Sequence, residues 1–225
     1  MKKATRILTI LLALVLAFSC LNIGNVGMTA MAQSKSSKAK KAYARKLARA
    51  GMGYDEFGVD NTNTYFKIAN LNKNDSIPEL IVANGNSEWE CMEVYTYVNG
   101  KVKFVTGTYS GDLKFYPTKN LIYYEYAHGG SFEAYYYKFN GKKLTKLTSK
   151  FGSDSVNLVT GKRKDPYAFD DLSYAPYVYK VKGKKASSKK YKSYVKQLKG
   201  NSKRLKVSLV RNTPSNRSKK LGYRK

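Results

Sequence analysis

The sequence predicts an α+β fold: a mainly antiparallel β-meander sheet with an N-terminal helix and a C-terminal amphipathic helix packed on it. The stretch from Thr64 to Val181 is rich in Tyr, Val, Ile and Phe and is divided by Gly, Asn and Asp, which is typical of short strands. Two Asn-Gly pairs predict tight hairpins, and helical patterns flank the stretch. We expect four parts: a signal peptide over 1–32, a basic helix over 33–54, one β-rich domain over 55–210 and a basic tail over 211–225.

Residues 1–32 are typical of a secretory signal peptide. They contain a basic head, a short apolar run and a small-x-small cleavage site: Lys2, Lys3 and Arg6; Ile7 to Phe18; and Ala30-Met31-Ala32. The apolar run is shorter than the roughly 20 residues that a membrane helix needs. We therefore expect cleavage after Ala32 and a secreted or cell-wall-associated chain with no stable membrane span. Lipidation at Cys20 is the alternative, although Phe18 fits a lipoprotein cleavage site poorly.

The first element of the mature chain is a predicted helix. Ser37 is placed to cap it, and Gly51 ends it after about Ala50. Tyr43 and Leu47, four residues apart, form a thin apolar stripe. We expect this helix to dock weakly on the core with its basic side chains in water.

Three glycine-containing turns divide the strand-rich stretch. Asn99-Gly100 and Asn140-Gly141 predict two-residue type I′ turns, because both positions need positive φ and Asn-Gly tolerates it; Lys182-Gly183 is a weaker copy. These glycines are 41 and 42 residues apart, a spacing that overlaps propeller blades. The intervening segments share little, so a single meander is expected. Two strand pairings follow from the turns: Tyr95 to Val98 with Lys101 to Phe104, and Tyr136 to Phe139 with Lys142 to Thr145.

The end of the domain is again helical. Ser187 or Ser188 caps a helix that stops at Gly200, and the i, i+3, i+4, i+7 spacing of its apolar residues predicts one face packed on the sheet. Those apolar residues are Tyr191, Tyr194, Val195 and Leu198. Alternation of Leu205, Val207 and Leu209 with polar residues predicts a last strand, and the basic tail after it has little to bury.

The net charge of +27 is unevenly distributed, because all 15 acidic residues lie between Asp55 and Asp171. Segregated like charges indicate an anionic partner near both ends. The excess of lysine over arginine favours diffuse attraction over reading of base sequence. We expect binding to anionic cell-wall polymers or glycans; export excludes intracellular nucleic acid and leaves extracellular DNA as an alternative. The expected contacts are Lys189, Lys190, Lys192, Lys196, Lys199, Lys203 and Arg204.

The segment from Asn70 to Leu80 resembles the D-x-[DN]-x-[DN]-G-x-P-E-L calcium-type loop of many secreted bacterial proteins. Here Asn replaces Asp at positions 70, 72 and 74, and one residue is inserted before Pro78. Because calcium affinity follows ligand charge, we expect a turn held by side chain-to-backbone hydrogen bonds and no cofactor. Calcium is the alternative, with Asn70, Asn72, Asn74, Asp75 and Glu79 as its candidate ligands.

The mature chain resembles a family of uncharacterised secreted proteins of Gram-positive anaerobes over most of its length. The resemblance is carried by this loop, by the Tyr-rich strands that end in Asn-Gly-Lys turns, and by the Lys/Tyr C-terminal helix followed by Asn212-Thr213-Pro214. The resemblance implies export and no particular activity.

Tyrosines on neighbouring predicted strands form the second candidate binding surface. Runs of Tyr put rings on both faces of a sheet, so one set joins the core and the other can form a platform on which sugar rings stack. The platform residues are Tyr124, Tyr126, Tyr135 and Tyr137. The alternative is that these rings only stabilise cross-strand pairs.

No catalytic motif accompanies the single histidine, so a non-enzymatic protein is favoured. His128 beside Glu125 is the weak catalytic candidate, and with Asp75 or Glu79 near a cleft it would make a small extracellular hydrolase, the alternative function. That alternative requires these groups to lie within hydrogen-bond reach of one another. Cys91 is expected to be a buried strand residue, because no second cysteine remains after cleavage.

Overall fold

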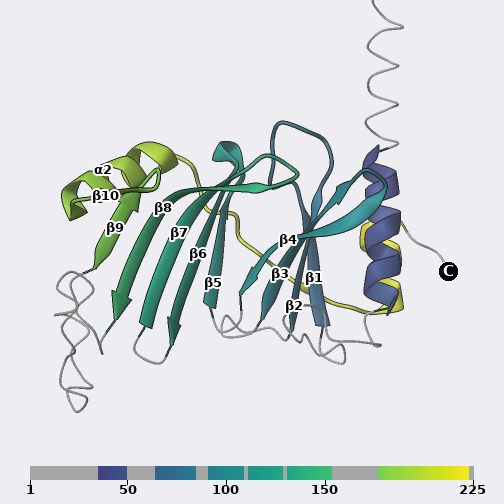
Figure 1. The fold of residues 1–225 in the computed structure, drawn as a ribbon. Helices are drawn as coiled ribbons and strands as arrows, with labels where there is room; N and C mark the ends of the chain where they lie inside the picture. Colours follow the sequence, from purple (N-terminus) through teal and green to yellow (C-terminus); the bar gives the residue numbers. More distant parts are fainter. Residues whose placement is uncertain are drawn as a thin grey trace, which may run out of the picture.

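The computed structural model describes residues 35–49, 64–84, 91–108, 111–128, 131–153 and 177–222. Over these residues the chain has an α+β fold with antiparallel sheets, as predicted (Figure 1). The predicted signal peptide, Cys20 and the cleavage site after Ala32 lie outside the described residues.

The described strands form two antiparallel sheets where a single meander was expected. The first sheet has the order β11-β1-β2-β3-β4, with bounds Val210–Arg211, Thr64–Ala69, Glu79–Asn84, Met92–Val98 and Lys101–Thr108. The second has the order β10-β9-β8-β7-β6-β5, with bounds Lys184–Ala186, Val178–Val181, Leu144–Ser153, Ser131–Phe139, Leu121–His128 and Gly111–Tyr116. The reason lies in strands such as β2, which is apolar on both faces and therefore needs a covering layer on each side.

The turns at Asn99-Gly100 and Lys182-Gly183 confirm the hairpins predicted there. Asn99 and Gly100 have φ of 51° and 80°, and β3 pairs with β4 from Val98 opposite Lys101 to Tyr95 opposite Phe104. Lys182 and Gly183 have φ of 49° and 79° between β9 and β10. Positive φ at both positions is the geometry that a type I′ turn requires.

The expectation for Asn140-Gly141 was wrong by two residues. Phe139 pairs with Leu144, so the loop has four residues, and only Gly141 has positive φ, at 84°. The Oδ1 atom of Asn140 accepts hydrogen bonds from the backbone N–H groups of Lys142 and Lys143, at 3.0 and 2.9 Å. This side-chain turn holds Asn140 outside the left-handed region and lengthens the loop.

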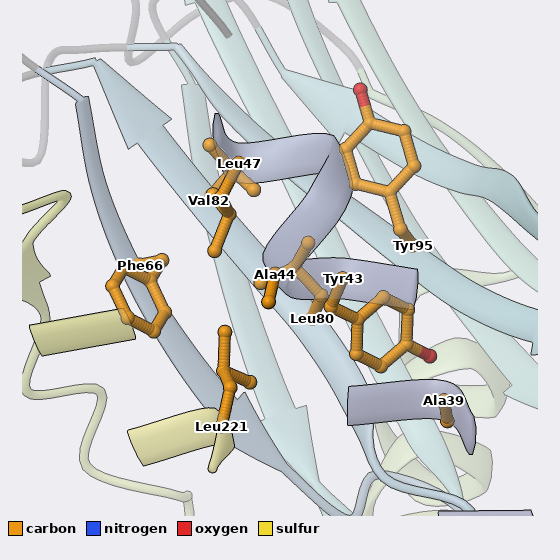
Figure 2. Close-up of a cluster of buried hydrophobic side chains, with 9 residues drawn as sticks. All are labelled: Ala39, Tyr43, Ala44, Leu47, Phe66, Leu80, Val82, Tyr95 and Leu221. Carbon is orange, nitrogen blue, oxygen red and sulfur yellow. The ribbon is translucent and has the colours of Figure 1, made fainter. Parts of the chain in front are cut away.

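The N-terminal helix covers the outer face of the first sheet more firmly than expected. Residues 35–49 are helical, so Ser37 lies within the helix and is not its cap. Tyr43 and Leu47 are only 0% and 2% exposed, and Figure 2 shows both side chains among the other members of a buried apolar cluster. The cluster around them draws side chains from the helix, the first sheet and the chain end: Ala39, Tyr43, Ala44, Leu47, Phe66, Leu80, Val82, Tyr95 and Leu221. The Tyr43 hydroxyl also donates to the Pro78 carbonyl at 2.9 Å.

Within the expected basic tail, the described residues include the end of β11, Val210–Arg211, and the helix α3, Pro214–Leu221. Leu205, Val207 and Leu209 pack against the core, but the strand itself is only β11. The backbone N–H of Leu205 donates to the Phe115 carbonyl of the second sheet at 2.8 Å, whereas β11 pairs with β1 of the first. This segment therefore crosses both sheets before α3, Pro214–Leu221, which lies beside the N-terminal helix (Figure 1).

A second cluster joins the two sheets. It combines Leu71, Ile81 and Val94 from the first sheet and its loop with Leu113, Phe115, Ile122 and Phe139 from the second. The other face of the second sheet carries α2, Ser188–Lys199, whose Val195 and Leu198 pack against Tyr116, Leu121 and Tyr136. The predicted packing of the C-terminal helix on a sheet is thus present.

Candidate functional site

The helix α2 presents a row of lysines to solvent. Ser187 caps it by accepting from the Lys190 backbone N–H at 3.2 Å, and it ends at Gly200, both as predicted. Tyr191 is 8% exposed on the sheet side. Side chains on the opposite side of the helix therefore point toward solvent. Three of them, Lys189, Lys192 and Lys196, are exposed.

The other predicted polyanion contacts divide into two groups. Lys190 and Lys203 are exposed. Lys199 is half-buried, with Nζ 5.1 Å from the ring centroid of Tyr116, and Arg204 pairs with Asp112 at 3.5 Å. Lys199 and Arg204 therefore already contact other residues of the same chain.

The neighbouring β9–β10 hairpin adds lysines that the sequence reasoning did not include. The hairpin contacts α2 through β9, and the Tyr179 and Tyr191 rings lie 5.0 Å apart. Its exposed lysines are Lys180, Lys182, Lys184 and Lys185. The density of lysine around the predicted Lys182-Gly183 turn was the available signal. We call these four together with Lys189, Lys192 and Lys196 the α2 basic surface.

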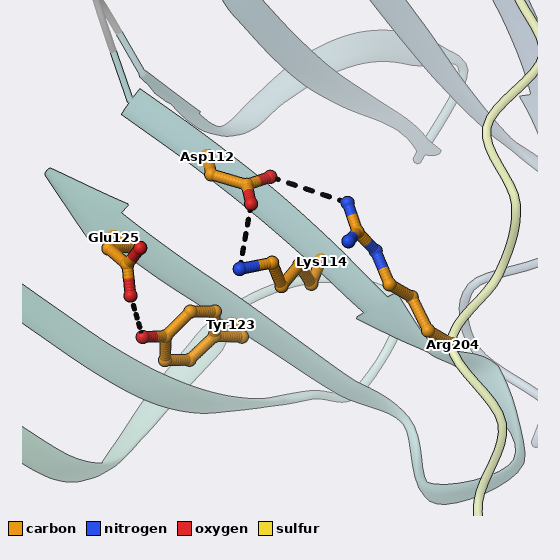
Figure 3. Close-up of polar contacts among 5 residues, drawn as sticks. All are labelled: Asp112, Lys114, Tyr123, Glu125 and Arg204. Atoms are coloured by element: carbon orange, nitrogen blue, oxygen red, sulfur yellow. Dashed lines mark hydrogen bonds and ion pairs between the residues drawn. The ribbon is translucent and has the colours of Figure 1, made fainter. Parts of the chain in front are cut away.

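Among the described residues, no carboxylate forms an ion pair with a lysine of this surface. Each of the described carboxylates is buried or half-buried: Asp75, Glu79, Glu93, Asp112, Glu125 and Glu133. Asp112 pairs with Lys114 at 2.8 Å and with Arg204 (Figure 3). The others accept hydrogen bonds from tyrosines or from the loop before β2.

Three glutamates share one arrangement, in which a tyrosine two positions away on the same strand donates to the carboxylate. Tyr95 donates to Glu93 at 2.5 Å, Tyr135 donates to Glu133 at 2.6 Å, and Tyr123 donates to Glu125 (Figure 3). Residues i and i+2 lie on the same face of a strand, so the period of the strand brings the two groups together. Burial and the carboxylate beside it raise the pKa of the Tyr135 hydroxyl.

The four predicted platform tyrosines lie on one face of the second sheet, opposite to the face that carries α2. Tyr124 pairs with Tyr135 across β6 and β7, and Tyr126 pairs with Glu133. The Tyr135 ring stacks on the Tyr124 ring, with 5.5 Å between the two ring centroids, and its centroid lies 5.7 Å from that of Tyr137. Burial raises the pKa of Tyr137 to about 12, with the hydroxyl of Tyr124 and the carboxylate of Glu133 contributing.

Two charged residues of this face were missed by sequence reasoning. Glu133 accepts from Tyr135, and the Nζ atom of Lys146 lies 3.8 Å from the Tyr135 ring centroid and 5.8 Å from that of Tyr137. The i, i+2 spacing of Glu133 and Tyr135 could have indicated the first. Nothing in the sequence pairs Lys146 with Tyr135, because the bulge between Tyr136 and Tyr137 sets the β7–β8 register.

The loop between β1 and β2 is held by its own side chains. Asp75 accepts from the Ile77 backbone N–H at 2.9 Å and from the Asn72 side-chain amide at 2.5 Å. Asn72 in turn accepts from the Asn74 N–H at 3.2 Å, and the Asn70 amide donates to the Asp75 carbonyl at 3.0 Å. Within the described residues, no three His, Cys, Asp or Glu side chains are grouped to hold a metal ion. The hydrogen bonds of Asn70, Asn72 and Asp75 form the turn that was expected.

Glu79, the first residue of β2, lies at the end of this loop and bonds back to its start. It is 0% exposed, and its Oε2 atom accepts from the Leu71 backbone N–H at 2.7 Å. Its Oε1 atom and the Asn70 Oδ1 atom are buried without a hydrogen-bond partner among the described residues. Burial, and then the nearby charge of Asp75, raise the pKa of Glu79 to about 8 despite the Leu71 bond.

The groups named for a hydrolase are held by separate partners. Glu125 lies on β6 of the second sheet and accepts from Tyr123, whereas Asp75 and Glu79 are bonded within the loop of the first sheet. The backbone of His128 ends β6 opposite Ser131, and its side chain lies outside what the structure describes. Cys91 is buried at 6% exposure, as predicted, although it directly precedes β3 and is not part of the strand.

No described helix has both the length and the apolar character needed to cross a membrane. Comparison of the chain with protein-family models, with curated proteins and with solved structures finds no match.

Proposed function

We propose that this protein is an exported, non-enzymatic component of the bacterial cell surface that binds anionic wall polymers through the α2 basic surface. The observation that carries the proposal is the outward row of Lys189, Lys192 and Lys196 beside the lysines of the β9–β10 hairpin. The described carboxylates lie inside the fold with partners of their own. An anionic polymer supplies the neutralising charge that the described part of the chain lacks.

The chemistry of lysine indicates what kind of polymer fits. An ammonium group on a flexible stem is a hydrated point charge, whereas planar two-bond recognition of phosphate is the property of arginine. A regular polymer of phosphodiesters, such as a teichoic acid, offers repeated single charges without a fixed register. The signal-peptide pattern of residues 1–32 supports the same location, because it predicts export to where such polymers occur.

A matched pair of triple variants tests the proposal. Lys189→Gln/Lys192→Gln/Lys196→Gln removes three charges from the α2 basic surface, and Lys73→Gln/Lys101→Gln/Lys103→Gln removes three exposed charges from the first sheet and its loop. Each lost phosphate contact lowers the slope of log affinity against log salt by about 0.7 to 0.9. We expect the first variant to lower the slope for soluble teichoic acid by about 2 to 3 and the second to leave it within error. Equal slopes for the two variants would refute the assignment to α2.

A further inference from the structure

We propose that the face of the second sheet opposite α2 binds a neutral sugar residue, with Glu133 accepting hydrogen bonds from sugar hydroxyls and Tyr137 packing against the sugar ring. This deepens the proposed wall association and rests on it for the choice of ligand. The site is nevertheless separate from the α2 basic surface, because the two occupy opposite faces of one sheet.

The register of β6 and β7 assembles the site. Tyr124 is opposite Tyr135, Tyr126 is opposite Glu133, and Tyr137 follows Tyr135 by two positions. Side chains in such a set point to one face of the sheet. The Tyr135 hydroxyl donates to Glu133 at 2.6 Å, and the charge of Glu133 also contributes to the raised pKa of the Tyr124 and Tyr137 hydroxyls.

Glu133 has acceptor capacity left for a ligand. Its Oε2 atom accepts from Tyr135 at 2.6 Å, and its Oε1 atom has no hydrogen bond among the described residues. The side chain is half-buried, so the carboxylate is held in place and still reaches water. A carboxylate that one tyrosine hydroxyl holds in place suits a ligand that offers O–H donors on a compact ring.

The rings provide the second element of sugar recognition. Tyr135 is 7% exposed and forms the floor, stacked on Tyr124 and contacted at its edge by Phe151 at 5.4 Å. Tyr124, which also packs against the apolar cluster between the sheets, and Tyr137 are both half-buried and keep part of their surface open. Tyrosine offers apolar area at a low cost in side-chain entropy, because it has only two torsions to fix.

The charges of the face argue against an anionic ligand at this position. Glu133 would repel a phosphate or carboxylate, and the Lys146 ammonium is already placed over Tyr135 at 3.8 Å. Lys146 is exposed at the rim, where it can donate to a sugar oxygen. A neutral sugar therefore fits better than the polymer phosphates assigned to α2.

Titration with N-acetylchitotetraose, followed by NMR at low and high salt, tests the proposal. We expect saturable binding that changes less than twofold between about 50 and 300 mM NaCl, because no ion pair forms with the ligand. Glu133→Gln should weaken binding about tenfold, since it replaces a charged acceptor by a neutral one. Glu125→Gln is the matched control: it also alters a glutamate bonded to a tyrosine two positions away, on the opposite face, and should change binding less than twofold.

Tyr137 provides an independent arm. Tyr137→Phe keeps the ring and should bind within about twofold of the wild type, whereas Tyr137→Ala should lose roughly fivefold or more. Binding that disappears at high salt, or that falls equally in the Glu133 and Glu125 variants, would overturn the proposal. Lack of saturable binding by the folded wild-type chain would overturn it as well. None of these outcomes changes the salt slope for teichoic acid, so failure here is distinguishable from failure of the α2 assignment.

Discussion

Gly141 of the second sheet lies directly against Asp75 of the first sheet's loop. A Cβ atom at position 141 would be 2.6 Å from the Asp75 Oδ2 atom and 2.7 Å from the Asn72 Nδ2 atom. The Gly141 carbonyl also accepts from the Thr96 hydroxyl at 2.9 Å. The four-residue β7–β8 loop therefore fits the β1–β2 loop closely, and this contact joins the two sheets beyond their shared apolar core.

Gly141→Ala should accordingly cost more stability than Gly100→Ala. Both glycines have positive φ, 84° and 80°, so both substitutions carry a backbone penalty of about 1 kcal/mol. A Cβ at Gly100 meets nothing within 4 Å, whereas a Cβ at Gly141 displaces Asp75 and Asn72. We expect an additional loss of roughly 1 to 3 kcal/mol for Gly141→Ala in urea unfolding. Equal losses for the two variants would show that the loops are not in contact.

Glu79 predicts a pH dependence of stability. Burial raises its folded pKa to about 8, above its ordinary value of 4.5. A raised pKa means that the folded state holds the proton more tightly, so the contribution is fully present below about 4.5 and is lost as pH rises to about 8. The loss is at most about 1.4 kcal/mol per pH unit. Urea unfolding of the wild type and Glu79→Gln at several pH values measures it. The variant should have the flatter profile, and parallel profiles would contradict the assignment.

Calcium should not stabilise the β1–β2 loop. The Asn72 amide donates to Asp75, which is a bond that an aspartate at position 72 could not make, and the Ile77 N–H donates to the other oxygen of Asp75. Hydrogen-bond donors thus take the place of a cation. We expect the melting temperature to change by less than about 1 °C at millimolar Ca²⁺, because a site of weak affinity gives little linkage. A rise of several degrees that EDTA reverses would contradict this prediction.

The sequence predicts the α+β class, the Asn99-Gly100 hairpin and the caps of α2 because each depends on residues close together in the chain. The division into two sheets is different. It depends on Ile81 and Val94 packing against Phe115 and Ile122, which no local pattern reveals. For the same reason, the thin stripe of Tyr43 and Leu47 does not indicate full burial, since α3 supplies Leu221 from the other end of the chain.

The candidate binding surfaces show the same difference between local sequence patterns, which can be predicted, and contacts between distant parts of the chain, which cannot. Helical spacing predicts that Lys189, Lys192 and Lys196 of α2 face water, because the apolar residues of one helix fix the opposite face. It does not predict the contact of Lys199 with Tyr116 of the second sheet. The four platform tyrosines are predicted by strand alternation. The contact of Lys146 with Tyr135 is not, because it depends on the bulge and register between β7 and β8.

Retention of the mature chain on purified bacterial walls, with and without teichoic acid, across a salt series tests the central claim most directly. Electrostatic binding predicts that retention requires the teichoic acid and that log affinity falls linearly with log salt between about 50 and 500 mM NaCl. Equal retention on both wall preparations, or retention that does not change with salt, would contradict the assignment of this protein to anionic wall polymers.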